Sequence, residues 1–433
     1  MNWIFLLFVG LSLFQLQSNK SCVTDLLAIN DVDILSYTKL GRVVGNEVVV
    51  EHDVDLEGKT CKLPKGFLLR IQNGIIKNGI LLGNQTKLSC KSIAFENISI
   101  KGSWNVPWIS TSFFADLGKV NSLKNVFALA NPDVKNTIII EKGEYLVKAF
   151  KDADVCLSLT DNTDLFLYGT IRIASNNFKR YNILQAGGNN ISIDGKGTII
   201  GDRNSHKGLE GEWGMGVNVR GAKNVTIKNL TIRECWGDCI YIGGNSKNTR
   251  IEDCILDNSR RQGISITKAD GVDIRNCTIS NIHGTNPQYA IDVEPNENCI
   301  VDHILIDNID VINCEGGIRA TVGKKGIGNA RIGRVEILNC HVSAKSRFPI
   351  HLNRCEQGIV KGCVIDTSND NPALFAAYVD GLIAENNTVN VEKQILPSIK
   401  NVVNEIVGKG KYTTIRLVKT SSKNVKDNKI IER

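Results

Sequence analysis

Apolar residues recur in short, regularly spaced blocks along the second half of the chain. Units close to Ile-x-Asn-Cys-x-Ile repeat from about residue 224: IKNLTI from Ile227, IEDCIL from Ile251, IRNCTI from Ile274, IDNIDV from Ile306, ILNCHV from Ile337, VKGCVI from Val360 and IAENNTV from Ile383. Successive units start 24, 23, 32, 31, 23 and 23 residues apart. Short β-rich units of this length, separated by Asn, Gly and Asp, predict the stacked coils of a parallel β-helix.

A second apolar block follows the first in each unit. The blocks are GVNV from Gly216, CIYI from Cys239, GISI from Gly263, AIDV from Ala290, GIRA from Gly317 and PIHL from Pro349. Their second residue is Val or Ile and their fourth is apolar, so both face the core and the third residue faces outward. Stacking the coils predicts an outward column of Asn218, Tyr241, Ser265, Asp292, Arg319 and His351. Glu294 shares this face, because it lies two residues after Asp292.

The chain contains 13 cysteines, and the repeat indicates what several of them do. The slot before the last two residues of the unit holds Cys254, Cys277, Cys340 and Cys363, and elsewhere Leu230 and Ile309. A slot shared with Leu and Ile is an apolar interior position, where a free Cys packs as a small hydrophobe. We therefore expect a buried ladder of mostly free thiols. The pair in CWGDC, Cys235 and Cys239, has no second pair at metal spacing, so no zinc site is expected.

The first half of the chain is less regular. The apolar run in residues 3–14 is shorter than the roughly 20 residues of a membrane span, so residues 1–21 are predicted to be a signal peptide and no membrane span is expected. Short strands predict a β-rich N-terminal extension over 22–114, followed by a β-helix domain over 115–433. Residues 122–133 predict a short N-terminal capping helix, and 137–147 the strand that follows it. The predicted class is all-β, a right-handed parallel β-helix.

Composition narrows the function classes. The net charge is +7, but Lys and Arg are scattered along the chain rather than run together, so nucleic acid is not an expected partner. A signal peptide implies a secreted, periplasmic or cell-surface protein. The expected assembly is a monomer or a homotrimer.

The repeats, together with the helix followed by IIIEKGEYLV, resemble the pectin-lyase-like superfamily of right-handed parallel β-helix proteins over about residues 115–400. That resemblance implies the fold more than the reaction, because the superfamily includes lyases, hydrolases, epimerases and phage tailspikes. The layout GMGVNV, WGDCIYI and RQGISI is similar to polygalacturonase-type glycoside hydrolases. It implies a polysaccharide as the partner.

The polygalacturonase-type pattern is only partly present. Its Asp-Asp pair retains the second member as Asp238, while Gly237 replaces the first, and Gln262 stands where the family has His. Asp292 and Glu294 fall near the positions of the family's Arg-x-Lys and reverse its charge. Two acids would repel a uronate carboxylate, so polygalacturonate is not the expected substrate.

The outward face nevertheless has the chemistry of a sugar-polymer site. Glycosidases use two carboxylates, about 5 Å apart for retention and about 6.5–9.5 Å for inversion. The predicted catalytic residues are Asp238, Asp292 and Glu294. Aromatic faces stack on sugar rings and polar groups bind hydroxyls, and the residues expected to do so are Trp213, Trp236, Tyr241, Arg260, Arg261, Gln262, Arg319 and His351. An insertion around NSHKGLEGEW is expected to wall one side of a cleft and to bring His206, Glu210 and Glu212 near it.

Other interpretations stay open. A polysaccharide lyase or epimerase would use Arg260, Arg261, Arg319 or His283 as base and charge neutraliser. A glycan-binding or adhesion β-helix would use the same surface without catalysis. No cofactor or metal is expected, with Ca²⁺ held by Asp292 and Glu294 as the alternative. Structural roles are the alternative for single residues: the acids bridged to Arg319 and Arg261, and the two tryptophans packed under the inserted loop.

Overall fold

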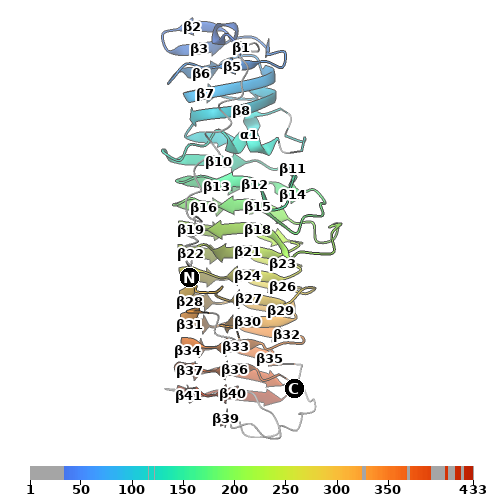
Figure 1. The fold of residues 1–433 in the computed structure, drawn as a ribbon, viewed down its shortest axis with the longest axis vertical. Helices are drawn as coiled ribbons and strands as arrows, with labels where there is room; N and C mark the ends of the chain where they lie inside the picture. The colour runs from blue at the N-terminus through green and yellow to red at the C-terminus, as the bar shows by residue number, and fades with distance from the viewer. Residues whose placement is uncertain are drawn as a thin grey trace, which may run out of the picture.

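The computed structural model describes residues 34–115, 117–120, 122–323, 328–367, 371–391, 405–407, 415–420 and 424–432. These residues form a column of stacked coils (Figure 1). Within the described part of the chain, every strand pairing is parallel except β2 with β3 and β39 with β40. The predicted parallel β-helix is confirmed. The predicted signal peptide, residues 1–21, lies outside the described residues.

The N-terminal part forms an eight-stranded sheet of its own. Its strands are β1 (Ile34–Leu35), β2 (Arg42–Val44), β3 (Glu47–Val50), β4 (Val54–Asp55), β5 (Thr60–Lys62), β6 (Leu68–Ile71), β7 (Ile76–Cys90) and β8 (Phe95–Asn105). Two 3-10 helices, η3 (Tyr37–Lys39) and η4 (Thr111–Phe113), flank it. The next strand, β9 (Trp108–Ser110), pairs in parallel with β10, so strand pairing runs on from this region into the coils.

Each coil contributes one strand to each of three long sheets. The first sheet consists of β9, β10 (Asn136–Ile140), β13 (Thr163–Leu167), β16 (Ile191–Asp194), β19 (Lys223–Lys228), β22 (Ser246–Glu252), β25 (Ala269–Arg275), β28 (Ile300–Asp307), β31 (Arg331–Leu338), β34 (Cys355–Lys361), β37 (Gly381–Glu385) and β41 (Asn424–Lys426). The Ile-x-Asn-Cys-x-Ile units begin in this sheet and end in the second one.

The second sheet consists of β11 (Glu144–Val147), β14 (Thr170–Ile173), β17 (Thr198–Ile200), β20 (Thr231–Arg233), β23 (Ile255–Asp257), β26 (Thr278–Ser280), β29 (Asp310–Cys314), β32 (His341–Ala344), β35 (Val364–Thr367), β38 (Thr388–Val391) and β42 (Lys429–Glu432). The third sheet carries the predicted site. It consists of β12 (Asp154–Leu159), β15 (Arg180–Ala186), β18 (Trp213–Arg220), β21 (Asp238–Gly243), β24 (Gln262–Ile266), β27 (Tyr289–Val293), β30 (Gly316–Thr321), β33 (Ile350–Asn353), β36 (Leu374–Ala377), β40 (Ile415–Val418) and β39 (Glu405–Val407).

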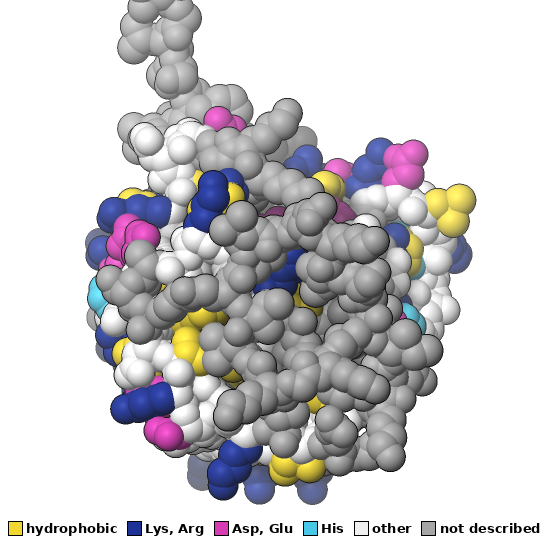
Figure 2. Space-filling view, turned by 90° about the horizontal axis from the view of Figure 1, so that it is seen from below, with side chains coloured by type: hydrophobic (Ala, Val, Ile, Leu, Met, Phe, Trp, Pro, Cys, Tyr) yellow, Lys and Arg dark blue, Asp and Glu magenta, His cyan; other side chains and the backbone are white. Residues whose placement is uncertain are grey.

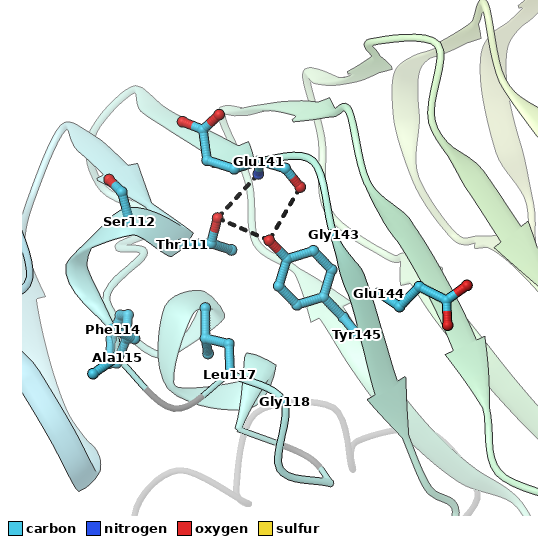
Figure 3. Close-up of a pocket in the computed structure, with 10 residues that line it drawn as sticks. All are labelled: Thr111, Ser112, Phe114, Ala115, Leu117, Gly118, Glu141, Gly143, Glu144 and Tyr145. Atoms are coloured by element: carbon cyan, nitrogen blue, oxygen red, sulfur yellow. Dashed lines mark hydrogen bonds between the residues drawn. The ribbon is translucent and has the colours of Figure 1, made fainter.

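The predicted capping helix is present as α1 (Leu123–Phe127), only five residues long. It packs against β8, β11 and β12, and in Figure 1 it lies between the N-terminal sheet and the first coils. The predicted strand over 137–147 divides into β10 and β11. At the turn between them the Tyr145 hydroxyl lies 3.0 Å from the Glu141 carbonyl oxygen and 3.3 Å from Thr111 Oγ1 (Figure 3). The Gly-x-Tyr-x-Val segment thus fastens the first coil to the residues that precede it.

The Asn of the repeat unit occupies a turn with left-handed backbone. Asn276 and Asn308 have φ of 52° and 55°, a conformation that Asn tolerates better than most residues. Their side chains also stack from coil to coil, since Asn308 Nδ2 donates to Asn276 Oδ1 at 2.9 Å. A second turn shows the same stacking, where Asn224 Nδ2 donates to Asn190 Oδ1 at 3.0 Å. Backbone geometry and these amide ladders therefore account for the repeated Asn.

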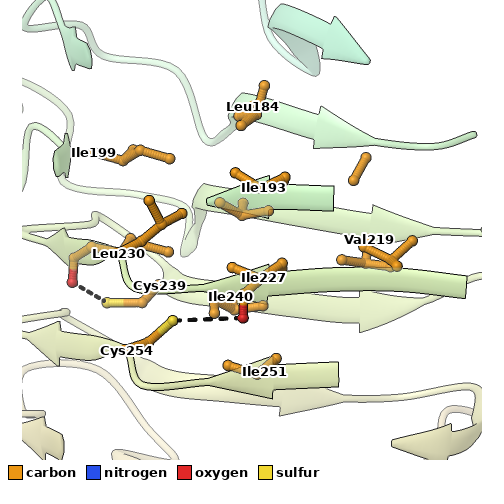
Figure 4. Packing of buried hydrophobic residues seen from close by; sticks show 14 of the residues in the cluster. Leu184, Ile193, Ile199, Val219, Ile227, Leu230, Cys239, Ile240, Ile251 and Cys254 are labelled. Carbon is orange, nitrogen blue, oxygen red and sulfur yellow. Dashed lines mark hydrogen bonds between the residues drawn. The ribbon is translucent and has the colours of Figure 1, made fainter. Parts of the chain in front are cut away.

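The core is a continuous column of mainly aliphatic side chains, with thiols among them in the repeated coils (Figure 4) and aromatic rings mostly nearer its N-terminal end. Ile193, Ile227 and Ile251 stack in the first sheet, and Cys254 follows Leu230 in the next slot. The cysteines that the structure describes are all free, and those of the predicted ladder are buried. The Cys254 thiol lies 3.8 Å from the Ile227 carbonyl oxygen. The predicted ladder of interior thiols is confirmed.

The outside of the column carries both signs of charge. Figure 2, which looks along the column, shows Lys, Arg, Asp and Glu side chains around its rim. Several form ion pairs along or between strands, such as Arg275 with Asp273 at 2.7 Å and Arg334 with Glu336 at 2.7 Å. None of the helices in the described ranges has the length and hydropathy to cross a bilayer.

Candidate functional site

The strand register places the predicted outward column as expected. Successive partners in the third sheet are Asn218 with Tyr241, Tyr241 with Ser265, Ser265 with Asp292, Asp292 with Arg319, and Arg319 with His351. One row upstream, Asp238 of β21 pairs with Gln262 of β24. Cys239 and Ile240 both lie in the core, so the strict alternation is broken there and Asp238 reaches the outward face, where its carboxylate meets Ser265.

Asp238 is completely buried on that face. Its carboxylate accepts from Arg261 Nη1, at 3.3 Å to Oδ1 and 3.1 Å to Oδ2. The Ser265 hydroxyl lies 2.7 Å from Oδ2. Burial without charge compensation would be costly, and Arg261 supplies that compensation.

Asp292 is equally buried but more tightly bound. Arg319 donates two hydrogen bonds to it, from Nε to Oδ1 and from Nη2 to Oδ2, both at 2.7 Å. This is the two-pronged geometry that makes Arg–carboxylate pairs strong. Gln262 Nε2 donates to Asp292 Oδ2 at 2.7 Å, and the same amide contacts Ser265 through its oxygen. Gln262 and Ser265 thus connect the two buried acids.

Glu294 is the partly exposed acid of the group, with 44% of its side chain accessible. It lies 3.1 Å from Arg319 Nη2 and 3.9 Å from Arg261 Nη2. Asp238, Asp292, Glu294, Arg261 and Arg319, joined by Gln262 and Ser265, are called the acid–arginine cluster below. The two arginines cover the two buried acids, so Glu294 is the predicted catalytic residue that reaches open space.

Burial changes the proton affinity of both covered acids. Desolvation raises the pKa of Asp292 to about 7, against the opposing attraction of Arg319. Desolvation also raises the pKa of Asp238, opposed first by Arg261. Raised acid pKa values next to fixed charges are typical of sites that handle protons.

A groove of about 570 Å³ opens on the third sheet beside the cluster. Arg261 and Glu294 line it, together with Trp213, Tyr241 and Asn218, all but Asn218 predicted for the site. Trp213 is 45% exposed, and the Tyr241 hydroxyl lies 2.8 Å from Thr267 Oγ1. A polar floor with one exposed indole suits a sugar chain, which offers both hydroxyls and apolar ring faces.

Three further groove residues are not among those predicted from the sequence. Arg180, Asn182 and Gln185 come from β15, which pairs with β18 upstream of the regular repeats. The alternation in RYNILQA marks this strand and would have extended the outward column by one coil. Glu212, by contrast, was expected near the cleft as part of the inserted loop, and it lines the groove 3.7 Å from Arg261 Nε.

Trp236 does not face the groove. The His206 ring stacks on one side of it at 3.8 Å between centroids, and the Arg260 guanidinium lies over the ring at 3.7 Å. Arg260 Nη1 also donates to the Gly211 carbonyl at 2.8 Å, which ties it to the inserted loop. Trp236 and Arg260 therefore hold the loop that walls the groove and leave no indole face for a sugar.

Gln262 and His351 were also predicted to contact the sugar, but neither of them lines the groove. Gln262 is completely buried within the cluster. His351 packs against Phe348 and Phe375, with centroids 4.8 and 5.1 Å apart, downstream of the groove. Burial, and then the nearby Arg319, lower the pKa of His351 to about 4, so the ring is neutral near pH 7.

The contacts of Asp292 and Glu294 argue against the alternative that these two acids bind Ca²⁺. Asp292 and Glu294 both direct oxygens at Arg319, and a cation there would compete with the guanidinium. Across the described ranges, no three or more His, Cys, Asp or Glu side chains are grouped so that they could hold a metal ion.

Comparison with known proteins agrees with the fold. Two curated relatives from Bacillus subtilis (strain 168) are each 28% identical to this chain: the SPbeta prophage-derived uncharacterized protein YorA over 184 residues, and the uncharacterized protein YclG over 229 residues. These matches cover 37% and 45% of this chain but only 31% and 39% of the relatives, so the chain spans about a third of their length.

One solved structure to which the chain is similar in part is the A-module of the mannuronan C-5 epimerase AlgE6 of Azotobacter vinelandii. It is 14% identical, with a TM-score of 0.44, and the match covers 72% of this chain and 94% of that module. A likeness of this size says nothing about activity. The family model described as "Right handed beta helix region" matches residues 169–329 and 215–432. Because these matches extend over more than half of the chain, the protein belongs to the right-handed β-helix family.

Proposed function

We propose that the protein is a carbohydrate-active enzyme that cleaves a polysaccharide bound in the groove of the third sheet, in the manner of a glycoside hydrolase. The observation that carries the proposal is Glu294, an accessible carboxylate at the edge of the groove, backed by two buried acids of raised pKa. The exposed face of Trp213 supports a sugar ligand.

A second carboxylate for hydrolysis is available across Arg261. Glu212 lies 3.7 Å from Nε of this guanidinium, and Glu294 lies 3.9 Å from its Nη2. The two carboxylates are therefore at most about 10 Å apart, on the order of the separation that leaves room for a water in inverting glycosidases. In this proposal Glu294 and Glu212 contact the glycan, while Asp238 and Asp292 act through Arg261 and Arg319.

One observation favours a second candidate, a groove that binds a glycan without cleaving it. Every acid of the cluster is paired with an arginine, and Arg261 and Arg319 are only 14% and 16% exposed. Such pairing stabilises a rigid surface as readily as it prepares a catalytic one. Turnover therefore has to be measured rather than inferred from binding.

The test is a panel of neutral and acidic polysaccharides incubated with the purified protein. We expect new reducing ends on at least one glycan, without the absorbance of an unsaturated uronate. Unsaturated product would show a lyase instead. Binding without either product would overturn the proposal in favour of the binding groove.

A further inference from the structure

The two buried acids, Asp238 and Asp292, are connected by hydrogen bonds through Ser265 and Gln262. Asp238 Oδ2 lies 2.7 Å from the Ser265 hydroxyl, which contacts the Gln262 side-chain oxygen, and Gln262 Nε2 lies 2.7 Å from Asp292 Oδ2. All four side chains are at most 2% exposed. Bulk water therefore cannot complete a hydrogen bond that one of them lacks.

The functional groups of these four side chains fix how many hydrogens are available to them. A serine hydroxyl carries one proton, whereas the Asp238 oxygen and the Gln262 oxygen are both acceptors when the acid is ionised. With both acids ionised, one of the two contacts of Ser265 would join two oxygens with no hydrogen between them. A single added proton on Asp238 completes the chain, because Asp238 then donates to Ser265 and Ser265 donates to Gln262.

The arginines decide which acid holds that proton. Asp292 receives two 2.7 Å hydrogen bonds from Arg319, which strongly favour its anion. Asp238 receives only the longer contacts of one Arg261 nitrogen, at 3.1 and 3.3 Å. Turning the Gln262 amide around would instead require the proton on Asp292, opposite the two-pronged arginine.

We propose that Asp238 and Asp292 form a one-proton pair in which Asp238 is the protonated acid and Asp292 the anion, with Ser265 and Gln262 as positioning residues. The charged or titratable groups that face the pair are Arg261 and Glu212 near Asp238, and Arg319, Glu294 and Tyr289 near Asp292.

Burial raises the pKa of both acids, which favours keeping a proton among these groups, and the two hydrogen bonds from Arg319 place the anion on Asp292. In this state Asp238 holds a proton next to Arg261, which lines the groove. This deepens the proposed function, because it gives a glycan site a held proton, but the state exists in the free protein and can be measured without any substrate.

Infrared spectroscopy of protein labelled with ¹³C at the Asp carboxyls tests the pair at pH 6. We expect one carboxylic-acid C=O band, shifted by the label, that fades as the pH is raised, because burial raises the pKa of Asp238. Asp238→Asn should remove the band, whereas Asp292→Asn should keep it. Asp273→Asn, which alters an ion-paired surface acid of the first sheet, is the matched control and should leave the band unchanged.

A positioning role for Ser265 is tested in the same spectrum. Ser265→Ala should keep the band and shift its frequency, because Asp238 then loses the hydroxyl that accepts its hydrogen bond. This measurement also serves if Asp238→Asn does not fold. The proposal would be overturned if the unaltered protein showed no acid band. It would also be overturned if the band were lost with Asp292→Asn but kept with Asp238→Asn, or if its frequency did not change with Ser265→Ala. Failure to cleave any glycan would leave these results unaffected and count only against the proposed function.

Discussion

Replacing Arg319 with Ala removes the partner of a fully buried carboxylate. In the folded protein Asp292 has no solvent exposure, and both of its oxygens accept from Arg319 at 2.7 Å. Removing one member of a buried ion pair typically costs about 3–5 kcal/mol, because the other charge stays buried without compensation. We expect a loss of this size in the free energy of unfolding above pH 7.

The loss of stability in Arg319→Ala should also depend on pH. Without Arg319 the pKa of Asp292 rises further, so the variant can protonate the acid and avoid the buried charge as the pH falls. The difference between Arg319→Ala and the unaltered protein should therefore be largest near pH 8 and shrink towards pH 5. Denaturant titrations at both pH values, followed by circular dichroism, measure it.

The control for this prediction is Arg275→Ala. Arg275 pairs with Asp273 at 2.7 Å on the first sheet, but its side chain is 40% exposed, so its loss should cost about 1 kcal/mol or less. The reasoning is refuted if Arg319→Ala destabilises the protein no more than Arg275→Ala does, or if its effect is the same at both pH values.

The unaltered protein should lose stability as the pH rises from about 4, because burial raises the pKa values of the Asp238–Asp292 pair, so the pair binds its one proton more tightly when folded than when unfolded. This contribution is complete below about pH 4 and is lost as the pH rises through the raised pKa of the pair, and its absence from the pH profile of Asp238→Asn would identify it. Trp213→Ala should weaken glycan affinity about two- to tenfold with little change in stability, since a stacking contact contributes about 0.5–1.5 kcal/mol. Trp236→Ala should instead destabilise the fold by about 3–5 kcal/mol; calorimetry of binding and of unfolding separates the two, and equal effects on affinity would contradict the assignment.

Much of the fold follows from local pattern. The apolar second and fourth residues of AIDV and GIRA determine which side chains face the core, and the order of the repeated units determines which coils lie next to each other. These two facts were sufficient to predict that Ser265, Asp292 and Arg319 are neighbours. The interior position of the cysteines followed from their exchange with Leu230 and Ile309.

The details of the site depend on contacts that alternation does not encode. An outward position on a strand predicts exposure for Asp292, yet both Asp292 and Asp238 are buried because the long side chains of Arg319 and Arg261, from the neighbouring coils, fold over them. Trp236 is covered by His206, a residue of an inserted loop 30 positions earlier, and no repeat pattern determines where such a loop lies. The sequence pattern therefore does not determine how far the arginine side chains extend or which path the inserted loop takes.

The central claim is that Glu294 takes part in cleaving a glycan, and turnover by Glu294→Gln tests it most directly. The comparison uses the polysaccharide that gives the most reducing ends with the unaltered protein, with Glu336→Gln as the control, since Glu336 is a carboxylate paired with Arg334 on the first sheet, away from the groove. We expect Glu294→Gln to lower kcat at least 100-fold while glycan affinity stays within about threefold, and Glu336→Gln to change neither. Full turnover by Glu294→Gln, on a glycan that the groove binds, would contradict the account.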